Sequence, residues 1–405
     1  MIEIEFSFIQ DTPIDTQAIA QVVEEFQASH QVRVHITPME WGQAWSELFT
    51  ISLDGRGADV SHIGSTWVSS LVAMNALRAF SPREIAILGG AEAFSRPIWE
   101  SSKVEGGEQV WAIPWTGNIY LICYRRDLFK QAGIDEAGAF GTVEALASTI
   151  QRVQKINVEF PWLTFRMSAQ FSFPMLHMAA SWVWGAGGDF ISKDGHKTLF
   201  TQPRSIAGLK AFLQTHRQVP APARQWEEQQ VLNAFRQGKA AMVITDIRSA
   251  IELINSSMAS PIRENIGTGA ISQVPWFGGN TVVIWRHTQG YPERERAAFD
   301  LVNFLASKGT QMSFAQKAQK LPARLEAASG LFPANHPLAA TVRQASQNGR
   351  DYPSTGLWRR IEFQLADALT SIRKEAVENE TADLETILHN QLDPLANRLD
   401  LTLKR

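Results

Sequence analysis

Strand-like and helix-like segments alternate through the N-terminal part of the chain, and this alternation limits the fold more than any other feature. Alternating apolar and polar residues predict strands over 2–9 and 32–36, and a short strand over 59–64 ends at a glycine. Apolar residues at helical spacing predict helices over 15–27 and 41–53. Strands that alternate with helices form a mainly parallel sheet with helices on both faces. We therefore expect an α/β fold.

The length and composition predict a two-domain globular protein. The 405 residues exceed the roughly 250–300 at which a single core stops growing. A hydrophobic content of 44%, a charged content of 20% and a net charge of −3 give no basic field for nucleic acid or a membrane surface. No apolar run reaches the roughly 18 residues that a membrane span needs. No linker rich in glycine and serine occurs, so the chain is expected to cross between its lobes more than once.

The single cysteine and the N-terminus say little about the compartment. Cys123 lies in an apolar run and is expected to be a buried, inert thiol. Met1 is followed at once by the first predicted strand, without a signal segment. The chain is therefore either cytosolic or a mature form that begins at its first strand.

Four loops are expected at one edge of the sheet, because ligands of α/β proteins bind outside the carboxyl ends of the strands. They are 9–11, 39–41, 64–67 and a break at Pro114, since proline cannot donate to a central strand ladder. Three of the four hold tryptophan, whose face covers a sugar ring while short polar side chains pair with hydroxyls. The alternative is that these tryptophans are core residues. The candidate ligand-binding residues in these loops are Gln10, Asp11, Glu40, Trp41, Ser65, Trp67, Trp115 and Asn118.

The second half of the chain adds two glycine-containing loops. The run 185–188 follows Trp184 and permits either a close approach of the backbone to a ligand or a tight turn before Asp189. The loop 275–280 contains Trp276 and ends at Asn280. We add Trp184, Gly187, Asp189 and Trp276 to the candidate residues.

Catalytic and metal-binding motifs do not occur in the sequence. It has no nucleophile elbow, phosphate-binding loop or dinucleotide fingerprint, and its nine histidines lack zinc-type spacing. We expect no cofactor and no metal. A glycoside hydrolase that uses Asp11 or Glu40 with Asp189 is an alternative, because such enzymes need two carboxyl groups. Carboxylates that accept hydrogen bonds from sugar hydroxyls are the preferred interpretation.

Several motifs in a fixed order resemble family 1 extracellular solute-binding proteins, the sugar receptors of ABC importers related to maltose-binding protein. The resemblance extends from Ile2 to about Leu392. Its pieces are Ala58-Asp59-Val60, Gly64-Ser65-Thr66-Trp67, Ala112-Ile113-Pro114-Trp115, Tyr124-Arg125-Arg126-Asp127-Leu128-Phe129, Gly187-Gly188-Asp189-Phe190, Phe235-Arg236-Gln237-Gly238-Lys239-Ala240-Ala241-Met242, Gly278-Gly279-Asn280 and Leu321-Pro322-Ala323-Arg324.

The resemblance implies a two-lobed periplasmic-binding-protein fold of the class II type, with the ligand in a cleft between the lobes. Lobe one would comprise 1–113 and 280–318, and lobe two 117–278 and 322–405, with hinge crossings near 114–116, 279–281 and 319–322. Trp67, Trp115, Asn118, Asp189, Gly279, Asn280 and Arg324 match positions that usually touch ligand in this family. Trp67, Trp115 and Asn280 should then converge in one groove.

The sequence departs from the family pattern at two places. Many relatives carry a carboxylate where Asn118 stands. Many also carry Gly-Pro followed by tryptophan where this chain has Asp246-Ile247 followed by Arg248. An arginine there can pair with an acidic or phosphorylated polyol, fork a sugar diol or reach solvent. Asp246 and Arg248 complete the set of candidate residues.

The resemblance implies a non-enzymatic receptor that binds a mono- or oligosaccharide and closes by hinge motion. Its partners would be the carbohydrate and the membrane permease subunits of the importer. Its location would be the periplasm, or the cell exterior on a lipid anchor, with the signal segment absent from this sequence. A cytosolic sensor domain is a further alternative.

Overall fold

The computed structural model describes residues 1–104, 106–166 and 172–403, which form two compact units. Unit 1 consists of Met1–Asn118, Phe277–Ala334 and Asp351–Arg359. Unit 2 consists of Ile119–Trp276, Asn335–Arg350 and Arg360–Arg405. The predicted lobe boundaries differ from this division, because 322–334 and 351–359 belong to unit 1. Residues 404–405 of the second predicted lobe lie outside the described residues.

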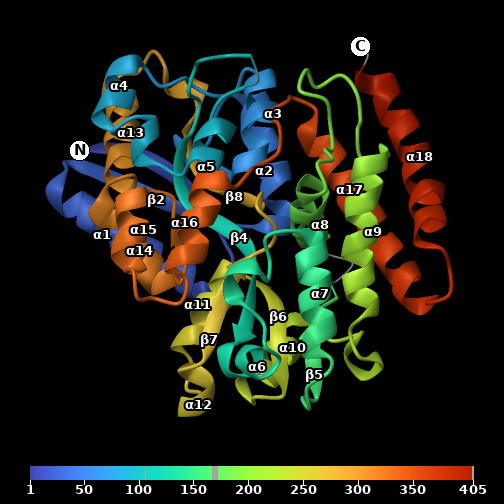
Figure 1. The fold of residues 1–405 in the computed structure, drawn as a ribbon. Coiled ribbons are helices and arrows are strands. Elements are labelled where there is room, and N and C mark those ends of the chain that lie inside the picture. The colour runs from blue at the N-terminus through green and yellow to red at the C-terminus, as the bar shows by residue number, and fades with distance from the viewer. Residues whose placement is uncertain (105, 167–171, 404–405) are drawn as a thin grey trace. The chain divides into compact units, whose positions relative to one another are not determined.

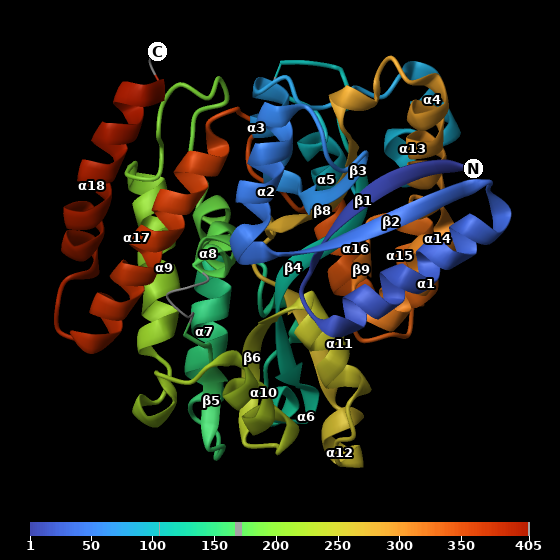
Figure 2. The same ribbon diagram turned by 180° about the vertical axis from the view of Figure 1, so that it is seen from behind.

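Unit 1 is built on a sheet in the order β2-β1-β3-β8-β4, with the two-residue strand β9 beside β4. Its elements are β1 (Ile2–Gln10), α1 (Pro13–Ser29), β2 (Val32–Glu40), α2 (Trp41–Asp54), β3 (Val60–Gly64), α3 (Val68–Ala73), α4 (Pro82–Ile87), α5 (Arg96–Ser101), the start of β4 (Ile113–Arg125), β8 (Phe277–Ile284), α13 (Pro292–Leu305), α14 (Lys308–Ala318), β9 (Leu321–Pro322) and α15 (Leu325–Leu331). Figure 2 shows β1 and β2 side by side.

The strands of unit 1 are held in register by apolar residues on both faces of the sheet. β1 pairs in parallel with β2 from Ile2↔Val32 to Gln10↔Glu40, and with β3 at Phe6↔Val60. Side chains of β1 alternate between faces, so Phe6 and Phe8 enter one cluster and Ile9 enters a second. Helix α1 covers the first cluster, in which Ile19, Val22, Val23 and Phe26 are buried at helical spacing. Helix α2 covers the second with Ala44 and Leu48.

Unit 2 has a smaller sheet in which β5 pairs in parallel with β6, while β4 pairs antiparallel with β6 and β7. Its elements are the end of β4, α6 (Arg126–Gln131), α7 (Val143–Val153), β5 (Phe160–Leu163), α8 (Phe173–Gly185), α9 (Pro203–Arg217), α10 (Glu228–Arg236), β6 (Ala240–Asp246), α11 (Ile247–Asn255), α12 (Ser260–Arg263), β7 (Ile266–Ala270), α16 (Ala339–Asn348), α17 (Trp358–Glu378, whose first two residues belong to unit 1) and α18 (Leu384–Leu403). Helices α9, α17 and α18 lie side by side (Figure 1).

Short 3-10 turns connect several of these elements. They cover Ser65–Trp67, Ala91–Ala93 and Arg286–Thr288 in unit 1, and Glu136–Gly138 and Ala221–Ala223 in unit 2.

Three local expectations from the sequence were wrong. The loop expected at 39–41 is absent, because β2 continues to Glu40 and α2 begins at Trp41. The predicted break at Pro114 is absent, because β4 runs without interruption from Ile113 to Arg125. Pro114 is the second residue of this strand, where a missing N–H is tolerated, and its carbonyl accepts a hydrogen bond from Gln311 Nε2 at 3.0 Å. The sheets are also mixed, whereas mainly parallel pairing was predicted. β8 returns antiparallel to β3, and β4 pairs antiparallel with β6, β7 and β9.

The close packing of α8 against α9 gives a stability prediction. A Cβ on Gly208 would lie 2.6 Å from the Trp182 carbonyl oxygen, which is rigid backbone. We expect Gly208→Ala to lower the free energy of unfolding by about 1–3 kcal/mol, because the helices must move apart. Gly141→Ala in the same unit is the control, since a Cβ there would meet no atom within 4 Å beyond its chain neighbours. Denaturant unfolding of both variants measures the difference, and equal stabilities would contradict the packing argument.

A second prediction concerns His62, which lies in β3 and stacks on Phe8. The ring is 4% exposed, its Nδ1 accepts a hydrogen bond from Ile9 N, and burial lowers its pKa to about 3. The unfolded chain therefore binds a proton below pH 6.5 that the folded chain excludes, and stability falls as the pH falls. His62→Gln should remove about 2 kcal/mol of the stability difference between about pH 7 and pH 5. His35→Gln, at an exposed position, should leave this stability difference unchanged. If His62→Gln loses as much stability between these pH values as wild type does, His62 is not the group responsible.

Candidate functional site

The carboxyl ends of β1 and β2 bring four predicted residues together in unit 1. Gln10 and Glu40 are opposite each other in the parallel ladder, and Gln10 Nε2 donates to Glu40 Oε1. In the residues that follow each strand, Trp41 Nε1 at the start of α2 donates to Asp11 Oδ1. Asp11 and Glu40 are exposed, and a carboxylate accepts several hydrogen bonds at once, so both can also accept from a ligand.

Lys320 lies beside these carboxylates and was not predicted. Its Nζ forms an ion pair with Asp11 and lies 3.5 Å from Asp15 Oδ2. Burial lowers the pKa of Lys320 to about 7, against the attraction of the two carboxylates. The resulting group of carboxylates and one amine can exchange hydrogen bonds with hydroxyl groups. Lys320 lies between α14 and β9, after the C-cap residue Gln319, and no motif at this position marks it in the sequence.

Three tryptophans gather next to this polar group. Trp67 makes edge contacts with Trp41 at 5.4 Å and with Trp45 at 5.6 Å between ring centroids. The Arg359 guanidinium lies 5.4 Å from the Trp45 ring and 5.6 Å from the Trp67 ring. We call Trp41, Trp45, Trp67 and Arg359 the tryptophan cluster. Trp41 and Trp45 are partly exposed, whereas Trp67 is 4% exposed and packs against both rings.

Ser65 has a structural partner. Its hydroxyl donates to Asp351 Oδ2 at 2.7 Å, and Ser101 Oγ donates to the same oxygen at 2.8 Å. Ser69 Oγ and Ser70 Oγ bond to the carbonyls of Thr355 and Gly356. These hydrogen bonds hold residues 351–359 against the rest of unit 1 and so position Arg359 in the tryptophan cluster.

Trp67, Trp115 and Asn280 were expected to converge in one groove, but the two tryptophans are buried in separate hydrophobic clusters. Asn280 lies opposite Gly64 in the β3–β8 ladder, and its Nδ2 donates to Thr116 Oγ1 at 3.3 Å. Trp115 is 1% exposed and packs against Phe8 and Phe314 in a hydrophobic cluster separate from that of Trp67. Stacking of Trp115 on a ligand would therefore require these core rings to move.

Gly279 and Arg324 both have structural roles in unit 1. A Cβ on Gly279 would lie 2.1 Å from the Thr116 carbonyl oxygen, so only glycine fits there. Arg324 Nη1 donates to the carbonyls of Leu88 and Ala306, each at 3.1 Å, and the guanidinium lies over Phe94. Asn118 is the last residue of the first segment of unit 1. Within residues 1–104, 106–166 and 172–403, no group donates a hydrogen bond to its buried Oδ1.

In unit 2, Trp184 and Asp189 are joined by Arg350. Trp184 Nε1 donates to Asp189 Oδ1 at 3.3 Å, and Arg350 Nη2 donates to Asp189 Oδ2 at 2.6 Å. The Arg350 guanidinium lies 5.0 Å from the centre of the Trp184 ring. Gly187 has a φ of 74°, which favours glycine and turns the chain after α8 toward Asp189.

Trp276 and Asp246 belong to a second group in unit 2. Trp276 is 3% exposed and lies between His177, with 4.3 Å between the ring centroids, and Tyr120, with 5.8 Å. Asp246 ends β6 and caps α11 by accepting a hydrogen bond from Ser249 N at 2.8 Å. The charge of Arg248 acts on Asp246, so this arginine has a carboxylate nearby.

Besides Lys320, the sequence analysis missed Trp45, Arg350 and Arg359, for different reasons. Trp45 is four residues after Trp41 on α2, a spacing that puts both on one helix face and could have been used. Arg350 and Arg359 lie far along the chain from the tryptophans they cover. No local pattern marks either arginine, because the fold alone brings them there.

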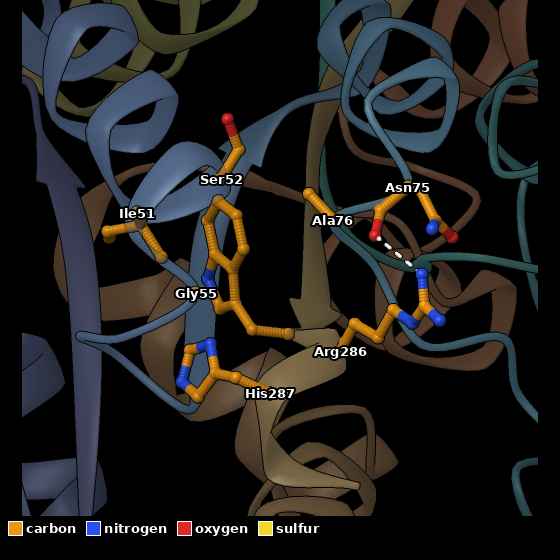
Figure 3. Close-up of a pocket in the computed structure, with 8 residues that line it drawn as sticks. Ile51, Ser52, Gly55, Asn75, Ala76, Arg286 and His287 are labelled. Carbon is orange, nitrogen blue, oxygen red and sulfur yellow. Dashed lines mark hydrogen bonds between the residues drawn. The ribbon is translucent and has the colours of Figure 1, made fainter.

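A pocket of about 270 Å³ in unit 1 lies elsewhere (Figure 3). Its lining residues are Ile51, Ser52, Gly55, Asn75, Ala76, Trp285, Arg286 and His287. Trp285 follows β8, whose end at Ile284 is opposite Val60 at the amino end of β3. The pocket is therefore at the other end of these strands from the tryptophan cluster, and it contains no predicted site residue.

The described residues offer neither a metal-binding cluster nor a membrane-spanning helix. Among them, no three histidine, cysteine, aspartate or glutamate side chains lie together in a way that could hold a metal ion. No helix in the described part of the chain is long and apolar enough to span a membrane.

Solved structures of sugar-binding proteins are similar to this chain along their whole length. MalE from Xanthomonas citri has a TM-score of 0.79 at 18% identity and covers 99% of this chain and 97% of its own. Maltose-bound MalE3 from T. maritima has a TM-score of 0.71 at 19% identity, covering 98% and 100%. A solute-binding protein from Agrobacterium radiobacter K84 in complex with ribitol has a TM-score of 0.71 at 18% identity, covering 98% of each chain. These similarities establish the two-lobed periplasmic-binding-protein fold.

No curated protein sequence matches the chain. The family model described as "Bacterial extracellular solute-binding protein" matches residues 21–341, which is more than half of the 405 residues. The chain therefore belongs to the bacterial extracellular solute-binding protein family.

Proposed function

We propose that this protein is the receptor subunit of an ABC importer and binds a mono- or oligosaccharide outside the cytoplasm. It delivers the sugar to the permease subunits in the membrane and does no chemistry on it. A signal peptide, or a lipobox cysteine for a lipid anchor, encoded upstream of Ile2 in the full gene would support export.

The tryptophan cluster and its adjoining carboxylates are the observation that carries this proposal. Partly exposed Trp41 and Trp45 at the start of α2 offer flat apolar surfaces, while Asp11, Glu40 and Gln10 at the ends of β1 and β2 offer acceptors and donors. A sugar needs both, because its ring has an apolar C–H face and a rim of hydroxyls. The structural relatives bound to maltose and ribitol support a hydroxyl-rich ligand.

The two compact units are proposed to be the two lobes of the receptor. The chain passes between them at five places, after residues 118, 276, 334, 350 and 359. Periplasmic binding proteins are a known case of hinge closure around a ligand, with motion absorbed at a few connecting residues. The interlobe cleft and the exact hinge residues stay predictions from the sequence.

Neither alternative activity gains support from the contacts within each unit. The glycoside hydrolase would need Asp11 or Glu40 with Asp189, but Asp11 is ion-paired with Lys320 and Asp189 with Arg350. A receptor for acidic polyols would use Arg248, whose charge already acts on Asp246. A neutral, hydroxyl-rich ligand fits these groups better.

Calorimetry against maltose, D-tagatose, ribitol and a set of other mono- and disaccharides tests the proposal. We expect micromolar binding of at least one sugar. Trp41→Ala should weaken that binding about tenfold or more, because a stacking surface worth about 1.5–3 kcal/mol is lost. Trp226→Ala is the matched control, since Trp226 packs on Phe160 in unit 2 away from these groups. Absence of heat with every sugar would count against a sugar receptor.

Incubation with aryl glycosides separates the receptor from the hydrolase. The receptor should leave α- and β-linked nitrophenyl glycosides of the bound sugar intact at protein concentrations above the dissociation constant. Release of nitrophenol that is lost in Asp189→Asn would instead establish the enzyme.

A further inference from the structure

An antiparallel strand pair in unit 2 brings a tyrosine and two carboxylates together. Tyr120 of β4 lies directly opposite Asp246, the last residue of β6. Side chains of directly opposed residues lie on the same face of a sheet, with Cβ atoms about 4.5–5.5 Å apart. Glu228 is the first residue of α10 and accepts a hydrogen bond from Thr245 Oγ1 at 2.9 Å, one residue before Asp246. The group lies at the carboxyl end of β6, the edge where α/β sheets bind ligands.

The Tyr120 side chain is 5% exposed, and its hydroxyl makes no hydrogen bond to the described residues but is not one of the fully buried polar atoms without a partner. Burial, and then the charges of Asp246 and Glu228, raise the pKa of Tyr120 well above its usual value, so the phenol stays protonated. The Trp276 ring contacts the Tyr120 ring in a tilted arrangement, with 5.8 Å between the centroids, and the buried Nε1 of Trp276 lacks a partner in the described part of the chain. Trp276 and Asp246 are thus both next to Tyr120, Glu228 lies near Asp246, and no hydrogen bond joins the two donors to the two carboxylates.

A bound polyol would satisfy this set of groups. Each hydroxyl of a sugar both donates and accepts, so adjacent hydroxyls can donate to Asp246 and Glu228 while they accept from Tyr120 and Trp276. A lone ammonium group would leave the two donors without acceptors, and a lone anion would be repelled by the carboxylates. The complement of donors and acceptors thus favours vicinal hydroxyls over either kind of ion.

We propose that Tyr120, Glu228, Asp246 and Trp276 form a subsite that binds two adjacent hydroxyls of the ligand. This inference rests on the proposed function as a carbohydrate receptor and adds the polar groups of unit 2 that select the sugar. Glu228 is a specificity-determining residue in it.

The subsite couples binding to pH. Burial, and then the negative charge of Asp246, raise the pKa of Glu228 to about 7, and burial raises the pKa of Asp246. The other charged groups that act on the pair are Glu252, which is ion-paired with Arg236, and Arg248. A sugar hydroxyl that donates to Glu228 stabilises the ionised carboxylate and so lowers the pKa of Glu228 in the complex. The complex holds fewer protons than the free protein, so affinity rises with pH.

Calorimetry at pH 6, 7 and 8 with the tightest-binding of maltose, D-tagatose and ribitol tests this subsite. The wild type should bind about 5- to 10-fold more weakly at pH 6 than at pH 8, as Glu228 becomes protonated below its pKa of about 7. At pH 7 it should release about half a proton on binding, seen as a dependence of the heat on the ionisation enthalpy of the buffer.

Two variants separate the subsite from a structural role. Tyr120→Phe removes a hydroxyl that bonds to no described residue, so it should keep the wild-type stability while weakening binding about 3- to 10-fold. Glu228→Gln resembles the protonated acid, so it should bind about tenfold more weakly than wild type at pH 8, nearly equally at pH 6, and with no proton release. Glu385→Gln, at an exposed ion pair with Lys210, should behave as wild type in every measurement.

The outcomes distinguish the two proposals. If the wild type binds a sugar and both variants bind it with unchanged affinity and pH dependence, the subsite is refuted and the receptor function stands. If the wild type binds none of the sugars in the full calorimetry panel, the receptor function fails and the subsite fails with it. Circular dichroism spectra identical to wild type exclude misfolding of Glu228→Gln as the cause of weaker binding.

Discussion

The parallel pairing of β1 with β2 and β3 is the constraint on which the site in unit 1 depends. Its register places Gln10 opposite Glu40, so that the loops after both strands begin at the same level. The side chains that follow, Asp11 and Trp41, then come within hydrogen-bonding distance of each other. A slip of one residue would turn Phe6 and Phe8 out of the core, so burial fixes the register and the register fixes the site.

Strand β4 places two aromatic residues in different surroundings. Trp115 and Tyr120 are five residues apart, an odd separation that puts their side chains on opposite faces of the strand. Trp115 enters the core of unit 1 against Phe8 and Phe314, whereas Tyr120 lies beside Asp246 in unit 2. The same strand thus contributes a packing residue to one unit and a polar group to the other.

These two cases show which parts of the site could be predicted from the sequence and which could not. The residues at the carboxyl ends of β1, β2 and β3 were predicted because strand periodicity and the α/β rule are local patterns, although α2 follows β2 directly and no loop separates them. The direction of Trp115 could not be predicted, because nearly every residue of β4 is buried and a strand buried on both faces shows no alternation. Nor could Arg350 or Asp351, since adjacent residues in the chain join different units and reach partners more than a hundred positions away.

Buried donors without partners are not by themselves evidence of a ligand site. Trp115 and Trp182 each have a buried Nε1 with no acceptor in the described residues, and both rings are packed in apolar surroundings. Trp276 differs because its ring contacts Tyr120, which lies beside two carboxylates whose like charges disfavour ionisation. Such an arrangement costs stability in the free protein, since buried polar groups are left unsatisfied and carboxylates are brought together. Sequences depart from consistent packing in this way chiefly where function requires it, and a bound polyol would remove both costs at once.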